Sequence, residues 1–189
     1  FGVATTVPES MIATLAQLPY VRRVHREREV RAHLEESLGQ IRAPDVWTNF
    51  GVKGEGVLVG ILDSGIDYLH PALGGGLGSD FKVAGGYDFV NSDPDPMDDN
   101  GHGTHVAGIV AADGIVIRGV SPKARLLAYK VLDASGRGLE RNIIAAIERV
   151  VDPNQDGDPR DMADIVNMSL GSDRGDPDDA LSRAVDNAV

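Results

Sequence analysis

An unbroken apolar run at residues 57–62, ended directly by Asp63, is the feature that most constrains the fold of this chain. A strand that is apolar at every position, rather than at every second position, is typical of a parallel sheet covered on both faces. The other expected elements alternate in type, with strands at 124–132 and 164–169, helices at 102–112 and 139–151, and a last helix capped by Asp176. This alternation predicts an α/β fold with a doubly wound, mostly parallel sheet and helices on both faces.

Residues 1–30 follow a different pattern. It consists of a strand-like run at 3–7, apolar residues at helical spacing over 11–18, and a second strand-like run at 21–30. Such a short α+β unit cannot bury a core of its own, so we expect it to dock on a larger domain. Residues 31–43 are mostly polar and predict a linker, and the main domain at 44–189 begins with a short helix that ends near Gly51.

Composition and charge exclude several classes of protein. The chain has 18 Lys and Arg against 29 Asp and Glu, for a net charge of −11. Such an acidic chain lacks the basic surface that nucleic-acid binding requires. No apolar run approaches the roughly 18 residues needed to cross a bilayer, so we expect no membrane span in this segment. The absence of cysteine excludes disulfides, thiolate metal sites and a cysteine nucleophile.

Asp63 and His102 are the residues best placed for chemistry. Asp63 lies at the carboxyl end of the first apolar strand, where functional residues of doubly wound folds gather. It either caps backbone amides of the following turn or orients a histidine as a catalytic acid partner. His102 opens a small-residue helix, and His105 one turn later leaves open a metal-dependent hydrolase that uses Asp63, His102 and His105. Histidine ligand pairs on helices are more often spaced four residues apart, which weakens that alternative.

The sequences around these residues resemble the aspartate and histidine boxes of the subtilisin-like serine proteases, or subtilases. They are Asp-Ser-Gly-Ile-Asp at 63–67 with His-Pro at 70–71, and His-Gly-Thr-His-Val-Ala-Gly at 102–108. Further segments resemble the family in the same order, at 119–122, 128–132, 136–138 and 167–171. The resemblance implies a subtilisin-like fold of which this chain holds the N-terminal half.

The resemblance also implies a function. The chain would belong to a serine endopeptidase with an Asp-His-Ser triad, in which His102 is the general base and Asp63 its orienting partner. His105 would be structural, on the buried face of its helix. The nucleophilic serine and the oxyanion-hole residue are expected beyond Val189, so the fragment alone is expected to be inactive.

Substrate binding and regulation are implied by the same resemblance. The residues expected to pair with substrate main chain as an added strand are Gly136, Arg137, Gly138, Ser169, Leu170 and Gly171. Residues 1–30 resemble the second part of an inhibitor-like propeptide, whose tail occupies the cleft until it is cleaved, here within 31–40. The expected partners are therefore a protein or peptide substrate and the chain's own propeptide, and the expected location is extracellular.

An acidic loop adds a candidate calcium site. Its oxygen-bearing residues alternate around a glycine, as in calcium-binding loops: Asp152, Asn154, Asp156, Asp158 and Asp161. A solvated acidic loop explains the pattern equally well, and the acidic cluster at 93–99 is better explained that way. Ala72 occupies the place where many subtilases have a calcium-binding aspartate. A non-catalytic, calcium-dependent binding module on a protease fold remains an alternative.

Overall fold

A computed structural model of the chain describes residues 3–27, 29–32, 41–115, 118–172 and 175–188, and for 29–32 its backbone alone. Its central sheet has the strand order β3-β4-β2-β6, and every neighbouring pair is parallel. The strands are β2 (Leu58–Asp63), β3 (Val83–Asp88), β4 (Arg125–Lys130) and β6 (Ile165–Asn167). This sheet confirms the predicted parallel α/β fold.

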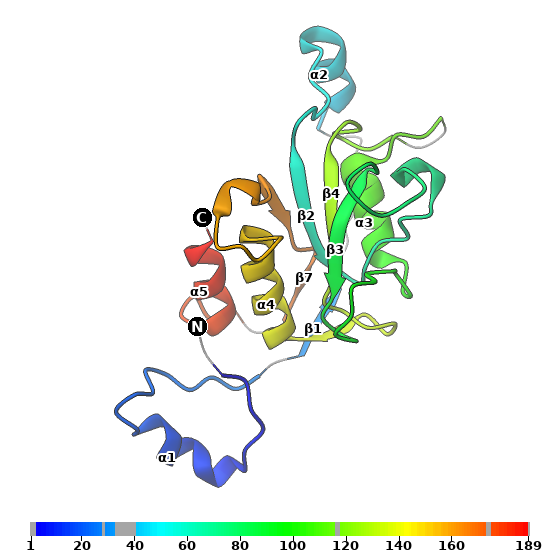
Figure 1. Cartoon of the computed structure of the whole chain (residues 1–189). Coiled ribbons are helices and arrows are strands. Elements are labelled where there is room, and N and C mark those ends of the chain that lie inside the picture. Colours follow the sequence, from blue (N-terminus) through cyan, green and yellow to red (C-terminus); the bar gives the residue numbers. More distant parts are fainter. Residues whose placement is uncertain (1–2, 28, 33–40, 116–117, 173–174, 189) are drawn as a thin grey trace.

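Helices cover both faces of this sheet (Figure 1). On one face, α3 (His102–Ala111) buries Val106, Ala107 and Ala111 against β2 and β4. On the other face, α4 (Glu140–Val151) buries Ile143, Ile147 and Val150, and α5 (Ala180–Asn187) packs outside it. Short 3-10 turns at η2 (Pro71–Leu73) and η3 (Pro159–Asp161) connect these elements. No helix in the described parts of the chain is long and apolar enough to span a membrane.

Two strands differ from the sequence-based expectation. The sequence pattern does not predict β3, because Gly85 and Gly86 at its centre weaken it. The strand at β6 forms, but Ile165 is 54% exposed and Val166 is 38% exposed, so it is not the buried strand that was predicted. Among the described strands, β6 pairs with β2 alone and forms an edge of the sheet.

The last helix begins later than predicted. Its N-cap is Asp179, whose side chain accepts a hydrogen bond from the backbone N–H of Ser182. The predicted cap, Asp176, instead accepts the N–H of Asp178 with its carboxylate and the hydroxyl of Ser182 with its carbonyl oxygen. Asp176 therefore forms an Asx turn that leads into the helix.

The N-terminal segment does not form the predicted unit of two strands and a helix. The helical part exists as η1 (Glu9–Met11) and α1 (Ile12–Ala16), but 3–7 and 21–27 contain no strand and no residue of 3–27 is buried. A strand needs a neighbour to satisfy its backbone, and the described segment offers neither run a partner. The segment extends away from the sheet (Figure 1) and contacts the main domain through two hydrogen bonds, from Arg23 to the carbonyl of Asp178 and from Arg141 to Glu27.

The strand that does form in this part of the chain is β1 (Glu29–Ala32). It lies antiparallel between β5 (Arg137–Leu139) and β7 (Leu170–Gly171) in a second sheet of order β5-β1-β7. The first two residues of the predicted linker, 31 and 32, belong to this strand, and residues 33–40 lie outside the described chain. At its other end, α2 (Ala43–Phe50) starts within the predicted linker and terminates at Gly51, which adopts the left-handed conformation.

Candidate active site

Asp63 and His102 meet at the carboxyl end of the central sheet. Asp63 is the last residue of β2 and His102 the first of α3, and Nδ1 of His102 lies 2.7 Å from Oδ1 of Asp63. Asp63 is fully buried, and this burial raises the pKa of its carboxyl group, although hydrogen bonds from His102 and from the backbone N–H of Ser64 act in the opposite direction. The same oxygen that lies against His102 accepts the Ser64 N–H at 2.7 Å, so Asp63 contacts both the following turn and the histidine ring.

Glycine at position 103 permits this close approach. A Cβ atom at Gly103 would lie 2.1 Å from the carbonyl oxygen of Gly65 and 3.2 Å from Oδ1 of Asp63. Gly101, the N-cap of α3, has φ +98°, a conformation that L-residues with side chains rarely adopt. The glycines on both sides of His102 therefore bring the start of α3 against the end of β2.

Asp98 organises the turn before His102, a role that the sequence analysis missed. Its carboxylate accepts hydrogen bonds from the backbone N–H groups of Asn100, Gly101 and Thr104. It also accepts the hydroxyl of Ser64, whose oxygen in turn accepts the N–H of Gly103. Burial by itself raises the pKa of Asp98, but the hydrogen bonds from Thr104, Gly101 and Asn100 together lower it below its usual value.

A sequence signal for Asp98 exists. Asp98 opens the run Asp-Asp-Asn-Gly at 98–101, just before a helix, and an aspartate in such a place is typical of side chains that bind the free N–H groups of a helix start. The acidic neighbours at 93, 95 and 99 hid this signal, because together they resemble a solvated loop. Asn100 also shapes the turn, because its side chain accepts the N–H of His102 and donates its amide to the carbonyl of Ala134.

The second ring nitrogen of His102 is positioned for proton transfer. Nε2 of His102 is buried and has no hydrogen-bond partner among the described residues, and the same holds for Oδ2 of Asp63. Because Asp63 holds Nδ1, the neutral imidazole carries its proton there and presents Nε2 as a base. This arrangement can accept a proton from a group placed near Nε2, and the buried carboxylate stabilises the imidazolium that results.

The strands predicted to bind substrate are β5 and β7, and the chain's own β1 lies between them. Val30 pairs with Gly138, Arg31 with both Arg137 and Gly171, and Ala32 with Leu170.

The two other predicted residues flank these strands. Gly136 lies in the turn before β5 with φ +74°, and the hydroxyl of Ser169, just before β7, accepts the side-chain amide of Asn167. Gly138 is required by the chain's own packing, since a Cβ there would lie 2.2 Å from the carbonyl oxygen of Val131. The approach of a peptide backbone, assumed from the sequence, is therefore not the only reason for glycine at this position.

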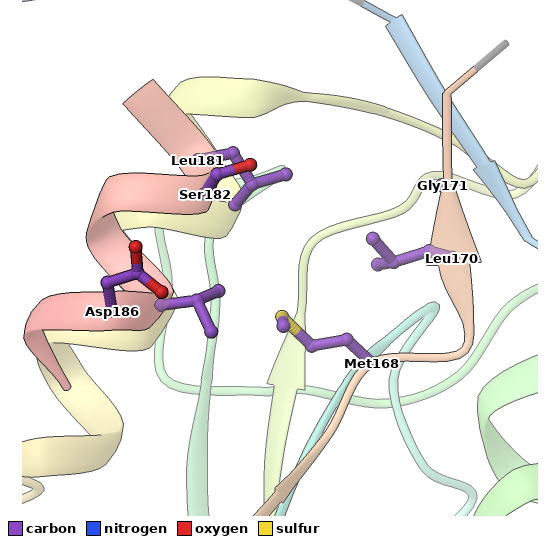
Figure 2. A pocket seen from close by; sticks show the side chains of 7 residues that line it. Met168, Leu170, Gly171, Leu181, Ser182 and Asp186 are labelled. Carbon is purple, nitrogen blue, oxygen red and sulfur yellow. The ribbon is translucent and has the colours of Figure 1, made fainter. Parts of the chain in front are cut away.

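A shallow groove adjoins β7. Figure 2 shows Met168 and Leu170 facing Leu181, Ser182 and Asp186 of α5 across it. The groove has a volume of about 360 Å³ and a mostly apolar lining. Side chains of a peptide that pairs with β7 would lie next to this groove.

The structure gives no support to the candidate metal sites. Across the described residues, no three His, Asp or Glu side chains converge as metal ligands would. In the acidic loop, both carboxylate oxygens of Asp152 accept backbone N–H groups, and Asp158 pairs with Arg160. The predicted calcium ligands Asp152, Asn154, Asp156, Asp158 and Asp161 therefore do not form a fitting site as they lie.

The three side chains of the metal-dependent hydrolase alternative do not come together either. His105 is exposed on the outer face of α3, whereas Asp63 is buried, so His105 does not join Asp63 and His102. This position also corrects the expectation that His105 lies on the buried face of its helix.

Residues 54–189 match the family model described as the subtilase family. The chain belongs to this family. It is 44% identical over 172 residues to the minor extracellular protease Vpr of Bacillus subtilis (strain 168). The aligned region covers 86% of this chain and 20% of Vpr. It is 37% identical over 194 residues to the serine protease AprX and 38% identical over 194 residues to subtilisin E, both from the same strain.

These relatives are longer than this subtilase chain. The matched regions cover 98% of the chain and 42% of AprX, and 100% of the chain and 46% of subtilisin E. The chain thus spans less than half the length of each of these three relatives. The Asp63–His102 pair and the strands β5 and β7 all lie within the residues that match the family.

Proposed function

We propose that this chain is the N-terminal part of a serine endopeptidase. The observation that carries the proposal is the antiparallel pairing of an extended segment, β1, with both β5 and β7. Main-chain pairing of this kind supplies affinity for an extended peptide segment, which is the form in which a peptide bond is presented for cleavage. The buried Asp63–His102 pair supplies the matching chemistry at the neighbouring sheet terminus.

The reaction follows from the chemistry of the pair. In the whole protein, a serine hydroxyl contributed by the rest of the domain attacks the scissile carbonyl while Nε2 of His102 takes its proton. Asp63 holds the proton on Nδ1 and stabilises the imidazolium through the 2.7 Å hydrogen bond. His102 then gives the proton to the leaving amine, and water hydrolyses the acyl-enzyme by the same steps.

We further propose that residues 1–30 are part of the chain's own propeptide. In this role, β1 occupies the peptide-binding edge and so blocks substrate until the chain is cleaved within 31–40. The contacts of Arg23 and Glu27 with the main domain support a docked position for this segment. An extracellular location goes with this proposal, and the similarity to Vpr, named as an extracellular protease, supports it.

Expression of the whole protein and labelling with a fluorophosphonate probe test the proposal. We expect covalent labelling in the wild-type protein and its loss in the His102→Ala variant, because the hydroxyl then lacks its base. The 189-residue chain alone should neither be labelled nor cleave peptides. Activity that a chelator abolishes without any labelling would favour a metal-dependent hydrolase, and a whole protein with neither property would favour a binding module.

A further inference from the structure

Lys130 is a buried cation next to the candidate active site that the proposed reaction does not use. It is the last residue of β4 and only 1% exposed. Its ammonium group donates to the carbonyl oxygens of Ser64 at 2.8 Å and Leu132 at 3.1 Å, and to the carboxylate of Asp99. These three bonds use all three N–H donors of the ammonium group.

The three partners belong to the three segments that build the site. Ser64 follows Asp63 and binds Asp98 through its hydroxyl. Asp99 lies in the turn that leads to His102. Leu132 donates its N–H to the carbonyl of Asp63 and forms a bridge with Gly138 of β5. One side chain therefore connects the end of β2, the start of α3 and the peptide-binding strand.

We propose that Lys130 is a positioning residue, whose ammonium group fixes the spacing between the Asp63–Ser64 turn, the turn before His102, and β5. Buried ion pairs often contribute little net stability compared with an apolar side chain of the same size, so stability alone is a weak reason for a lysine here. A rigid ammonium that binds three separate segments instead holds Nδ1 of His102 and Oδ1 of Asp63 in hydrogen-bond contact. The catalytic consequence rests on the proposed function, but the geometric claim does not.

The titration of His102 distinguishes positioning from simple electrostatics. The ionisable groups placed around the pair are Asp63 itself, Asp98 in the turn before α3, and Lys130 with Asp99 behind Ser64. Loss of a nearby positive charge by itself makes a histidine easier to protonate. Loss of contact with the Asp63 carboxylate makes it harder to protonate. The two explanations therefore predict opposite shifts when Lys130 becomes neutral.

The experiment follows the pH titration of the His102 ring by NMR in histidine-labelled protein, with assignment from a His102→Gln variant. In Lys130→Met we expect the titration midpoint to fall by about half a pH unit or more, and in Lys130→Arg to return toward the wild-type value. The matched control is Lys82→Met, because Lys82 also donates to two backbone carbonyls, those of Pro122 and Ala124, away from the site. It should leave the His102 titration unchanged. A midpoint that rises or stays constant in folded Lys130→Met overturns the proposal.

A second pair of variants serves if Lys130→Met does not fold. The Asp99 side chain is half exposed, so it tolerates substitution more readily than Lys130. Asp99→Asn and Asp99→Ala remove the same charge, but only the asparagine keeps a hydrogen-bond acceptor for Lys130. We expect His102 to titrate a few tenths of a pH unit lower in the alanine variant than in the asparagine variant. Identical titrations would also overturn the proposal. Because this readout needs no turnover, a wild-type protein without fluorophosphonate labelling would contradict the proposed function and leave the positioning role standing.

Discussion

The junction of β2 with α3 and the segment at 3–27 show clear patterns in the sequence, yet only the junction is built into a core. At the junction, Leu62, Asp63 and Ser64 are all fully buried, and the start of α3 lies against the end of β2. In the segment, no residue is buried and neither 3–7 nor 21–27 contains a strand. The helical pattern of the segment forms a short helix without burial, whereas a strand forms only where a neighbour satisfies its backbone and a core only where a second element covers the apolar face.

The largest effect should come from the centre of the junction. In the whole protein, we expect Asp63→Asn to lower kcat/KM about 10⁴-fold, because asparagine favours the wrong tautomer of the histidine. The same variant should be more stable at neutral pH. Burial raises the pKa of Asp63, so the folded state holds the proton more tightly than the unfolded state, and ionisation costs stability above the usual carboxyl pKa. Steady-state kinetics measures the loss of kcat/KM, and urea unfolding measures the gain in stability. At about pH 3 the carboxyl group is protonated in the folded and the unfolded state, so a stability gain that persists there would contradict the predicted cause.

Close packing at the junction gives the next largest effect. We expect Gly103→Ala to lower the free energy of unfolding by about 3 kcal/mol, because the added methyl group overlaps the Gly65 carbonyl and approaches Asp63. Gly108→Ala in the same helix is the matched control, since nothing lies within 4 Å of the added atom. It should stabilise the protein by about 0.5–1 kcal/mol through helix propensity. Equal effects in urea unfolding would show that the junction is less closely packed than described.

Asp98 should give a smaller effect with a pH dependence opposite to that of Asp63. The net pKa of Asp98 is lowered in the fold, so its carboxylate contributes stability above the usual carboxyl pKa that is lost as the pH falls through the lowered value. We expect Asp98→Asn to cost about 2 kcal/mol near neutral pH, from the loss of charge-assisted hydrogen bonds to the turn before α3. This cost should shrink in acid. A cost independent of pH in urea unfolding would mean that the charge of Asp98 is not what stabilises the turn.

Of these regions, the N-terminal segment should contribute least to thermal stability. Deletion of residues 1–27 should lower Tm by less than about 4 °C, because only exposed contacts, worth about 1 kcal/mol or less, are lost. Deletion through residue 32 is the control, since it also removes both antiparallel pairings of β1 and should cost more. If deletion of residues 1–27 lowers Tm as much as Gly103→Ala does, the segment forms part of a core. Differential scanning calorimetry measures all three.

Calcium should have the smallest effect. As placed, the side chains at 152–161 bind their own loop and Arg160, so saturating calcium should shift Tm by less than about 1 °C. The same measurement in the presence of a chelator is the control. A calcium-dependent rise of several degrees that disappears in Asp152→Asn would support the calcium site predicted from the sequence.

The alternation of apolar runs and amphipathic helices was enough to predict the parallel α/β sheet and helices on both of its faces. It was not enough for β3, where Gly85 and Gly86 break the strand pattern, or for the start of α5, where two aspartates compete as caps. For the site, the position of Asp63 at a strand end and of His102 at a helix start made both residues candidates. The role of Asp98 was missed, because its acidic neighbours make the stretch before α3 resemble a solvated loop, and its hydrogen bonds to the turn become visible only in the structure.

The sequence by itself determined that Asp63 ends a strand and that His102 begins a helix, because local periodicity, glycines and caps act over a few neighbouring residues. Only the tertiary structure decided that Asp63 and His102 are 2.7 Å apart, that β1 lies between β5 and β7, and that Lys130 joins three segments. These are contacts between segments tens of residues apart along the chain. Their geometry depends on how helices pack on the sheet and on which strand finds a partner, and no local pattern records that choice.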